Sequence, residues 1–430
     1  MDLDPAFLES DDLRAALAAR DISTLYRLLQ RLGVTQREIA RLTGQSQPEV
    51  NDILKGRKVR DVWVLERITD GLGIPRARMG LSYGEQELDA PSAKEVDENM
   101  KRRVLLSAAL GEAFLGLDAP IEVPLPTGDP LPSRLGMSHV HEVRAVTERL
   151  RGVGRYYGGQ AGLFSDAVTR YTRWLRVPAT KEVQAQLAAA LAELHTQAGW
   201  YCYDSGLDGT GHFTRGLRLA HQAGDAYAIT NAAWHAGATL VRDGHPNDAL
   251  KLFTLGGFAA RQSTRTTPRP EDPRLPTLTA FLNLNSATAY ALMGGPDEAT
   301  DYLAKAHDGW EPRNTFERAG MDRATAAIHL DLGQLDTAEP LATNALRTYS
   351  ENHRTDRTMA ELLLAEIHIR AGEPQGLTLA RHAIEGVSTL HSIATRRQRL
   401  LPLATALETR PSTDTRELAR TARQIATTRT

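Results

Sequence analysis

Apolar residues recur at spacings of three and four along most of the chain, which is the period of a helix with one buried face. In residues 22–32 this face consists of Leu25, Leu28, Leu29 and Leu32. Runs of β-branched residues, which would favour strands, are scarce. The pattern is broken by an acidic polar stretch at 85–98 and by proline-rich stretches at 119–133 and 261–277. We therefore expect an all-α protein with a linker at the first break and loops at the other two.

Residues 22–82 predict five short helices, and the second and third begin with the same kind of cap. Thr35 and Glu38 in TQRE have the spacing of a capping box, in which each residue accepts from an orphan amide of the first turn. Ser46 and Glu49 in SQPE repeat that spacing. Gly44 lies between the two helices, where glycine accepts a left-handed turn. Two capped helices joined by such a turn predict a helix-turn-helix.

The stretch TQREIARLTGQSQPEVNDILKGRKVRDVWVLERITDGLGIP resembles the lambda-repressor-like (XRE) family of DNA-binding domains. It carries the family's T-Q-x-E-[IL]-A, T-G-x-S-Q and [IV]-x-x-[IL]-x-x-G blocks, within about 60 residues. The resemblance implies that the helix after Gly44 enters the major groove of double-stranded DNA.

Position in this motif then implies a role for each polar residue. The residues implied to read bases are Gln45, Gln47, Glu49 and Asn51. The residues implied to contact phosphates are Gln36, Arg37, Lys55, Arg57 and Lys58. The capping role of Glu49 competes with a base contact. Asp52 places an acid where many relatives have a base, which weakens attraction to the DNA backbone.

The charge distribution changes what the total suggests. The chain has a net charge of −2, which argues against a nucleic-acid binder. Residues 22–84, however, hold eleven basic and six acidic residues, a net charge of +5. Their flanks are acidic, at −4 for residues 1–21 and −5 for residues 85–98, and residues 391–430 carry +5. The basic segment coincides with the helix-turn-helix and supports DNA binding.

A weak repeat runs through the C-terminal part. Its turn residues are Asp204, Gly244, Gly294, Gly333 and Gly372. Seven residues before the last four turns lie Gly237, Ala287, Ala326 and Ala365. Five and twelve residues after the turns, most positions are again Gly or Ala. Small residues at this spacing let paired helices pack closely, and the pattern resembles the tetratricopeptide repeat, with a period longer than the usual 34.

Polar residues on the first helices of these pairs are candidates for a ligand groove. They are Asn231, Trp234, Asn283, Asn285, Asp322, Arg323 and Glu361. Asparagine offers both a donor and an acceptor, which suits an extended peptide. The alternative is that these residues form solvated faces or bind neighbouring repeats.

A helix-turn-helix followed by such repeats resembles peptide-sensing quorum regulators. It resembles actinobacterial (Streptomyces-type) regulators of development and secondary metabolism more closely, through VWVLERITDGLGIPRARMGLSYG and FTRGLRLAHQAGD. The resemblance implies a homodimeric transcriptional regulator that binds an inverted-repeat operator and senses a peptide, small molecule or protein partner. The alternative is a protein-interaction scaffold in which the repeats bind a partner and the helix-turn-helix is secondary.

The expected organisation divides the chain into four parts. These are an acidic extension (1–21), a five-helix helix-turn-helix domain (22–84), a linker (85–100) and a repeat domain for sensing and dimerisation (101–430), a TPR-like α-solenoid. Residues 100–117 resemble a twin-arginine signal but are better interpreted as the helix that opens the second domain.

Several functions are not expected. Cys202 is the only cysteine, which excludes an intramolecular disulfide and a cysteine-rich zinc site. No apolar run is long enough to span a bilayer, and no nucleotide-binding or hydrolase motif is present. We expect no enzyme activity, cofactor, metal or membrane contact, and a cytoplasmic, nucleoid-associated protein.

Overall fold

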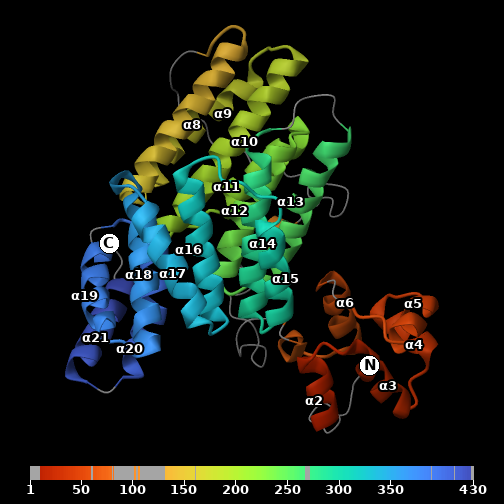
Figure 1. Cartoon of the computed structure of the whole chain (residues 1–430). Coiled ribbons are helices and arrows are strands. Elements are labelled where there is room, and N and C mark those ends of the chain that lie inside the picture. Colours follow the sequence, from red (N-terminus) through yellow and green to blue (C-terminus); the bar gives the residue numbers. More distant parts are fainter. Residues whose placement is uncertain are drawn as a thin grey trace.

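A computed structural model describes residues 10–59, 62–79, 81, 101–102, 105–106, 131–159, 161–266, 272–388, 390–410 and 412–427. Within these residues every regular element is a helix, so the expected all-α class is confirmed (Figure 1). An N-terminal unit (residues 10–81) is followed by an array of paired helices (residues 131–427). The expected linker at 85–100, most of the helix at 100–117 and the loop up to residue 130 lie outside the described residues.

The N-terminal unit contains the five expected helices and one more. Its elements are α2 (Asp11–Ala18), α3 (Ile22–Arg31), α4 (Gln36–Thr43), α5 (Gln47–Leu54), α6 (Val62–Leu72) and the 3-10 helix η1 (Arg76–Met79). Helix α2 lies in the segment that the sequence set apart as an acidic extension. Its Leu13 and Leu17 are buried in the same core as Leu25, Ile39 and Ile68, so α2 is part of this unit.

Glycine and capping residues end and begin the two central helices. Gly44 follows α4 with a φ of 59°, the left-handed conformation expected there. At α5 both halves of the second capping box form between Ser46 and Glu49. At α4 only half of the first box forms. Thr35 Oγ1 accepts from the Glu38 amide, but the Glu38 carboxylate binds Arg41 instead of the Thr35 amide, because a guanidinium one turn away offers two charged donors.

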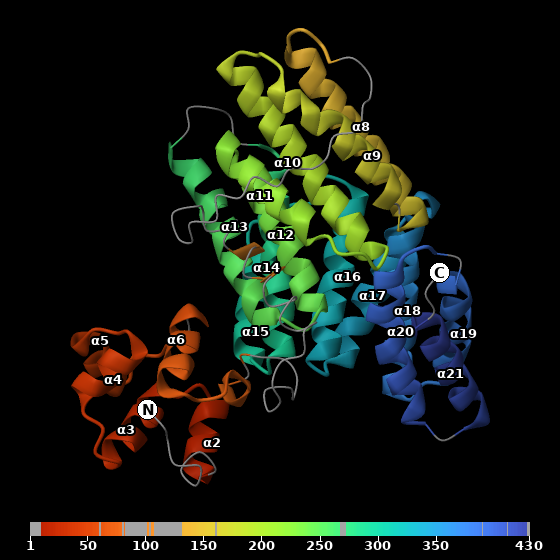
Figure 2. The same cartoon turned by 180° about the vertical axis from the view of Figure 1, so that it is seen from behind.

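The array consists of antiparallel helix pairs that follow one another along the chain (Figures 1 and 2). Its opening helices are α8 (Met137–Tyr157), α9 (Ala161–Thr172) and η3 (Arg173–Arg176). The pairs are α10 (Lys181–Asp204) with α11 (Thr210–Ala223), α12 (Ala226–Arg242) with α13 (Pro246–Thr266), α14 (Leu275–Leu292) with α15 (Pro296–His307), α16 (Thr315–Asp331) with α17 (Leu335–Thr348), α18 (Arg354–Ala371) with α19 (Gln375–Ser388), and α20 (Ile393–Glu408) with α21 (Thr413–Thr427). Helix η4 (Glu351–His353) precedes α18.

The expected turn and small residues explain how the pairs pack. Gly244, Gly294, Gly333 and Gly372 all have positive φ angles between the helices of a pair. A Cβ on Gly256 of α13 would lie 2.6 Å from Leu282 Cδ1 on α14 and 3.3 Å from Ala233 Cβ on α12. A larger residue here would have to displace the end of the Leu282 side chain and press on Ala233, so glycine favours this close approach of three helices.

The proline-rich segment is shorter as a loop than the sequence predicts. Helix α13 continues to Thr266, and α14 begins at Leu275, so both ends of the expected loop at 261–277 are helical. The prolines do not oppose this arrangement, because Pro276 occupies the first turn of α14, where a missing N–H costs nothing.

The last pairs of the array return to its first helices. Helix α18 contacts α8, and α20 contacts α10. The His391 amide donates to the Tyr157 carbonyl at 3.1 Å, and Ser392 Oγ donates to the Asp204 carboxylate. Asp204 also accepts from the Gly159 amide at 2.8 Å, and burial raises the pKa of this carboxyl. We call these contacts the end closure.

Candidate nucleic-acid interface

Helix α5 is fixed at its first turn by its cap. Glu49 Oε2 accepts from the Ser46 amide at 2.7 Å and from Ser46 Oγ at 2.8 Å. These bonds, with the positive charges of Arg67 and Arg57, lower the pKa of Glu49. One carboxylate oxygen of Glu49 is thus engaged in the cap.

Gln47 and Asn51 lie one turn apart on the same side of α5. Gln47 is exposed and Asn51 is partly exposed. Neither side chain has a hydrogen-bond partner among the described residues. Both amides therefore keep a donor and an acceptor available at the surface.

Gln45 is held in a different way. Its Oε1 accepts hydrogen bonds from the hydroxyls of Tyr26 and Thr43, the second at 3.0 Å. Tyr26 is fully buried, and this burial raises the pKa of its phenol. Gln45 therefore joins the turn to the core of the N-terminal unit. Tyr26 had no signal in the sequence other than its place on the apolar face of α3.

The residues expected to contact phosphate lie at two places beside α5. Gln36 and Arg37 form the first turn of α4, where Arg37 is exposed. Lys55, Arg57 and Lys58 are exposed in the segment that follows α5. A helix N-terminus and a basic segment thus flank α5. Asp52 is exposed on α5.

Two arginines that the sequence analysis did not single out also contact the helix-turn-helix. Arg27 Nη2 on α3 donates to the Leu54 carbonyl at 2.9 Å and so caps the C-terminal end of α5. The exposed Arg67 on α6 covers the turn, because a Cβ on Gly44 would lie 3.2 Å from Arg67 Cδ. Its charge acts on Glu49 from outside the motif, a relation that spacing along the chain does not reveal.

The array divides the seven groove candidates into two sets. Three of them face the second helix of their own pair. Asn283 Nδ2 donates to the Lys305 carbonyl at 3.4 Å, Asn344 Nδ2 donates to Asp322 Oδ2 at 2.5 Å, and Glu361 lies 3.7 Å from a Cβ on Gly386.

The remaining candidates are Asn231, Trp234, Asn285 and Arg323. Asn285 donates to the Phe281 carbonyl within α14, and Arg323 donates to the Tyr349 hydroxyl and pairs with Asp356 at 3.6 Å. Trp234 approaches the Phe281 ring, with 5.9 Å between centroids. Trp234 thus joins α12 to α14, whereas Arg323 joins α16 to the segment that follows α17 and to α18.

The face of α12 that carries Asn231, His235 and Arg242, which we call the inner face, is enclosed by other helices. The His235 ring lies 3.2 Å from Gln197 on α10, and Arg242 donates to Gln398 on α20 at 2.9 Å. Desolvation lowers the pKa of His235 to about 3 and also lowers the pKa of Arg242. Two donors here, Asn231 Nδ2 and Trp234 Nε1, are buried without a hydrogen-bond partner among the described residues.

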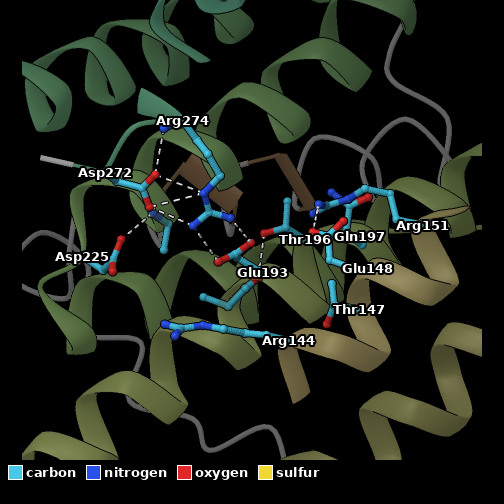
Figure 3. A network of polar contacts seen from close by, with 12 residues as sticks. Arg144, Thr147, Glu148, Arg151, Glu193, Thr196, Gln197, Asp225, Asp272 and Arg274 are labelled. Atoms are coloured by element: carbon cyan, nitrogen blue, oxygen red, sulfur yellow. Dashed lines mark hydrogen bonds and ion pairs between the residues drawn. The ribbon is translucent and has the colours of Figure 1, made fainter. Parts of the chain in front are cut away.

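A polar network at the start of α14 is structural (Figure 3). Arg274 pairs with Glu193 on α10 at 3.1 Å and with Asp272 at 2.8 Å. Its guanidinium also lies 3.7 Å from the centre of the Tyr227 ring. All the charged groups of this cluster are paired, so it connects α10, α12 and α14 and offers no open ligand position.

Among the described residues, no group of three or more His, Cys, Asp or Glu side chains could hold a metal ion. None of the helices described is long and apolar enough to cross a membrane.

Comparison with known families agrees with the geometry of the N-terminal unit. No curated protein matches the chain. Residues 14–80, however, match the family described as a helix-turn-helix domain, and this match begins within α2. The N-terminal unit is therefore a helix-turn-helix domain.

Proposed function

We propose that this protein is a sequence-specific DNA-binding transcriptional regulator. The observation that carries the proposal is the surface of α5, where Gln47 and Asn51 present unengaged amides on a capped helix of a helix-turn-helix domain. Such amides can form two hydrogen bonds with adenine in the major groove. Gln45 and Glu49 are the other proposed base contacts, each with one side of its polar group already engaged by the domain.

Phosphate contacts supply the affinity in this proposal. We assign them to Gln36 and Arg37 on one side of α5 and to Lys55, Arg57 and Lys58 on the other. Arg67, exposed over the Gly44 turn, adds a cation at the N-terminal end of α5. Asp52 opposes this attraction, which lowers non-specific binding.

A binding titration on genomic fragments tests this function. The full chain is expected to retain selected fragments in preference to random DNA. The logarithm of its affinity should fall with the logarithm of salt concentration, by roughly 0.9 for each phosphate contact. Arg423→Ala, which removes an exposed arginine of α21, is the matched control and should bind as the parent does. Absent or salt-insensitive binding would contradict the proposal.

The proposed regulator is a homodimer on an inverted repeat. Two-fold symmetry would place two α5 helices about one DNA turn, roughly 34 Å, apart. Sedimentation of the chain with and without a selected fragment measures the stoichiometry, and one chain per fragment would contradict this part of the proposal.

The repeat array is proposed to sense a ligand, through its inner face. Buried donors without acceptors cost about 1–3 kcal/mol each, and Asn231 Nδ2 and Trp234 Nε1 are two such donors close together on α12. A ligand that supplies acceptor oxygens would remove this cost. Native mass spectrometry of the chain purified from its host should detect a bound molecule that the variant Asn231→Leu loses. Equal occupancy in both chains would contradict sensing at this face.

A further inference from the structure

The helix-turn-helix domain contacts the array through a buried acidic side chain. Glu66 on α6 is 6% exposed, and its carboxylate accepts from Lys251 Nζ on α13 at 2.6 Å. Asn247 Nδ2, one turn earlier on α13, donates to the same carboxylate. Arg76 of the domain itself completes the set at 2.8 Å. Three polar side chains from two parts of the chain thus meet at one carboxylate.

The charged neighbours of Glu66 also have ion-pair partners of their own, which fixes where each of them lies. Lys251 is 8% exposed and pairs also with Asp248, which lies 3.8 Å from Arg102. Arg76 pairs also with Asp70 at 2.6 Å. Because Glu66 and Lys251 are buried, separating them leaves each charge either uncompensated in the interior or in need of water, so a partly open contact is unfavourable.

Helix α6 transmits this contact to the DNA-binding surface. It packs on α4 without an intervening side chain at Gly71, where a Cβ would lie 1.9 Å from the Leu42 carbonyl oxygen. Helices α4 and α5 must therefore turn with α6 as one body. The direction of α5 relative to the array is set wherever α6 is held.

The apolar part of the same junction is incompletely packed. Val62 of α6 is buried against the array, but beside it lies a cavity of about 230 Å³ lined by α13, α14 and α15, including Phe253, Leu282 and Tyr302. Apolar contact alone thus does not fix α6 on α13. The charged cluster is therefore the part of the junction that favours a single orientation of α6 on α13.

We propose that Glu66, Lys251 and Asn247 form an interdomain latch that sets the direction of α5 relative to the repeat array. Any event that displaces α13 acts on DNA binding through this latch. The proposed consequence for DNA rests on the proposed function, whereas the latch itself can be tested without DNA.

Spin-label distance measurement on the full chain tests the latch directly. Arg31→Cys on α3 and Arg381→Cys on α19 provide two exposed labelling positions, and the only native cysteine, Cys202, is buried. The parent should give one narrow distance distribution. Glu66→Gln and Lys251→Met should each lose the narrow peak. Glu408→Gln, which breaks an exposed ion pair of the last helix pair, is the matched control and should keep it.

The double variant Glu66→Met/Lys251→Met separates the latch from simple damage. It removes both buried charges together, while Arg76 keeps Asp70 and Asp248 keeps Arg102, so no buried charge is left uncompensated. The narrow peak should still be lost, because apolar contact alone does not fix α6 on α13. Its return would show that an unpaired charge broadens the distribution in the single variants, and would overturn the proposal. A broad distribution in the parent, or single variants that keep the narrow peak, would overturn the proposal. If Glu66→Gln unfolds the domain, Lys251→Met still tests the latch, because this substitution changes only the array.

Binding to DNA then distinguishes the two proposals. Neither Glu66 nor Lys251 is assigned to DNA, so the single variants should keep the parent's affinity for a duplex with one half-site. They should lose the parent's preference for one spacing between two half-sites. A parent that shows the expected distances but binds no DNA refutes the proposed function and leaves the latch standing. Variants with altered distances but unchanged spacing preference refute the effect of the latch on DNA.

Discussion

At the scale of single residues, the proposed function gives different tasks to Gln47, at the start of α5, and Arg57, after its end. Both side chains are exposed, and we propose that Gln47 contacts base edges and Arg57 contacts phosphate. Gln47→Ala should therefore relax sequence choice, with a loss of about 1–3 kcal/mol on the selected site and little on random DNA. Arg57→Ala should weaken all sequences alike and reduce the salt slope by about 1. Fluorescence anisotropy on both DNAs measures this, and equal losses for the two variants would refute the division.

Tyr26 provides a second test at this scale. Its buried hydroxyl donates to Gln45, so Tyr26→Phe should lower the free energy of unfolding by about 0.5–1.5 kcal/mol. It should also leave the Gln45 side chain held by Thr43 alone and so broaden sequence choice. Chemical denaturation and selection from a random DNA library measure the two effects. An unchanged stability would show that the bond contributes nothing.

The sequence predicted the residues whose roles are local. The Ser46–Glu49 cap and the Gly44 turn involve residues at most three apart, and both formed as expected. Glu38 was misjudged because Arg41, also three residues away, competes for the same carboxylate. Spacing alone does not show which of two nearby donors, the Thr35 amide or the Arg41 guanidinium, the Glu38 carboxylate binds.

At the scale of elements, the packing of α6 on α4 depends on Gly71. Gly71→Ala would force a Cβ to within 1.9 Å of the Leu42 carbonyl oxygen, so these helices must separate. We expect a loss of at least about 1–3 kcal/mol in domain stability. Gly152→Ala, in α8 with open space around the new Cβ, is the matched control and should stabilise by up to about 1 kcal/mol. Thermal unfolding distinguishes them, and similar shifts would contradict the packing argument.

Deletion of residues 1–21 should unfold the helix-turn-helix domain. It removes α2, whose Leu13 and Leu17 are almost completely buried in the domain core. Loss of the domain's cooperative unfolding transition would confirm this, whereas an intact transition would show that α2 is dispensable. The acidic charge of this segment concealed its role in the sequence, because its apolar residues are few and belong to a face only two turns long.

At the scale of the whole molecule, buried histidines tie the stability of the array to pH. Burial lowers the pKa of His195 and of His235 to about 3, from 6.5 in the unfolded chain. Their contribution to stability is complete above pH 6.5 and is lost as the pH falls toward 3, because only the unfolded chain then binds their protons. At pH 4.5 each accounts for a loss of about 3 kcal/mol.

His235→Gln should therefore flatten the dependence of unfolding free energy on pH between 6.5 and 4.5. The exposed His382→Gln is the control and should leave the parent's curve unchanged. Denaturant titrations at several pH values provide the comparison. A parent slope that persists in the His235 variant would show that this ring is not buried neutral.

Contacts between distant parts of the chain were beyond sequence reasoning. Asp204 and Ser392 are 188 residues apart, and Glu66 and Asn247 are 181 apart. Each of these residues, seen in its own helix, is an ordinary polar position. Periodicity identified the paired helices and their turns, but it contains no information on where the array returns to itself.

The end closure limits how such a chain can change over evolutionary time. An open solenoid can gain or lose a repeat, because each repeat meets only its neighbours. Here the segment before α20 must reach Asp204 and Tyr157, which lie in the first helices of the array. A duplicated or deleted helix pair would carry Ser392 away and leave the buried carboxylate of Asp204 with the Gly159 amide but without its hydroxyl donor. The end closure thus fixes the number of helix pairs in the array, because it joins the late helices to the first ones.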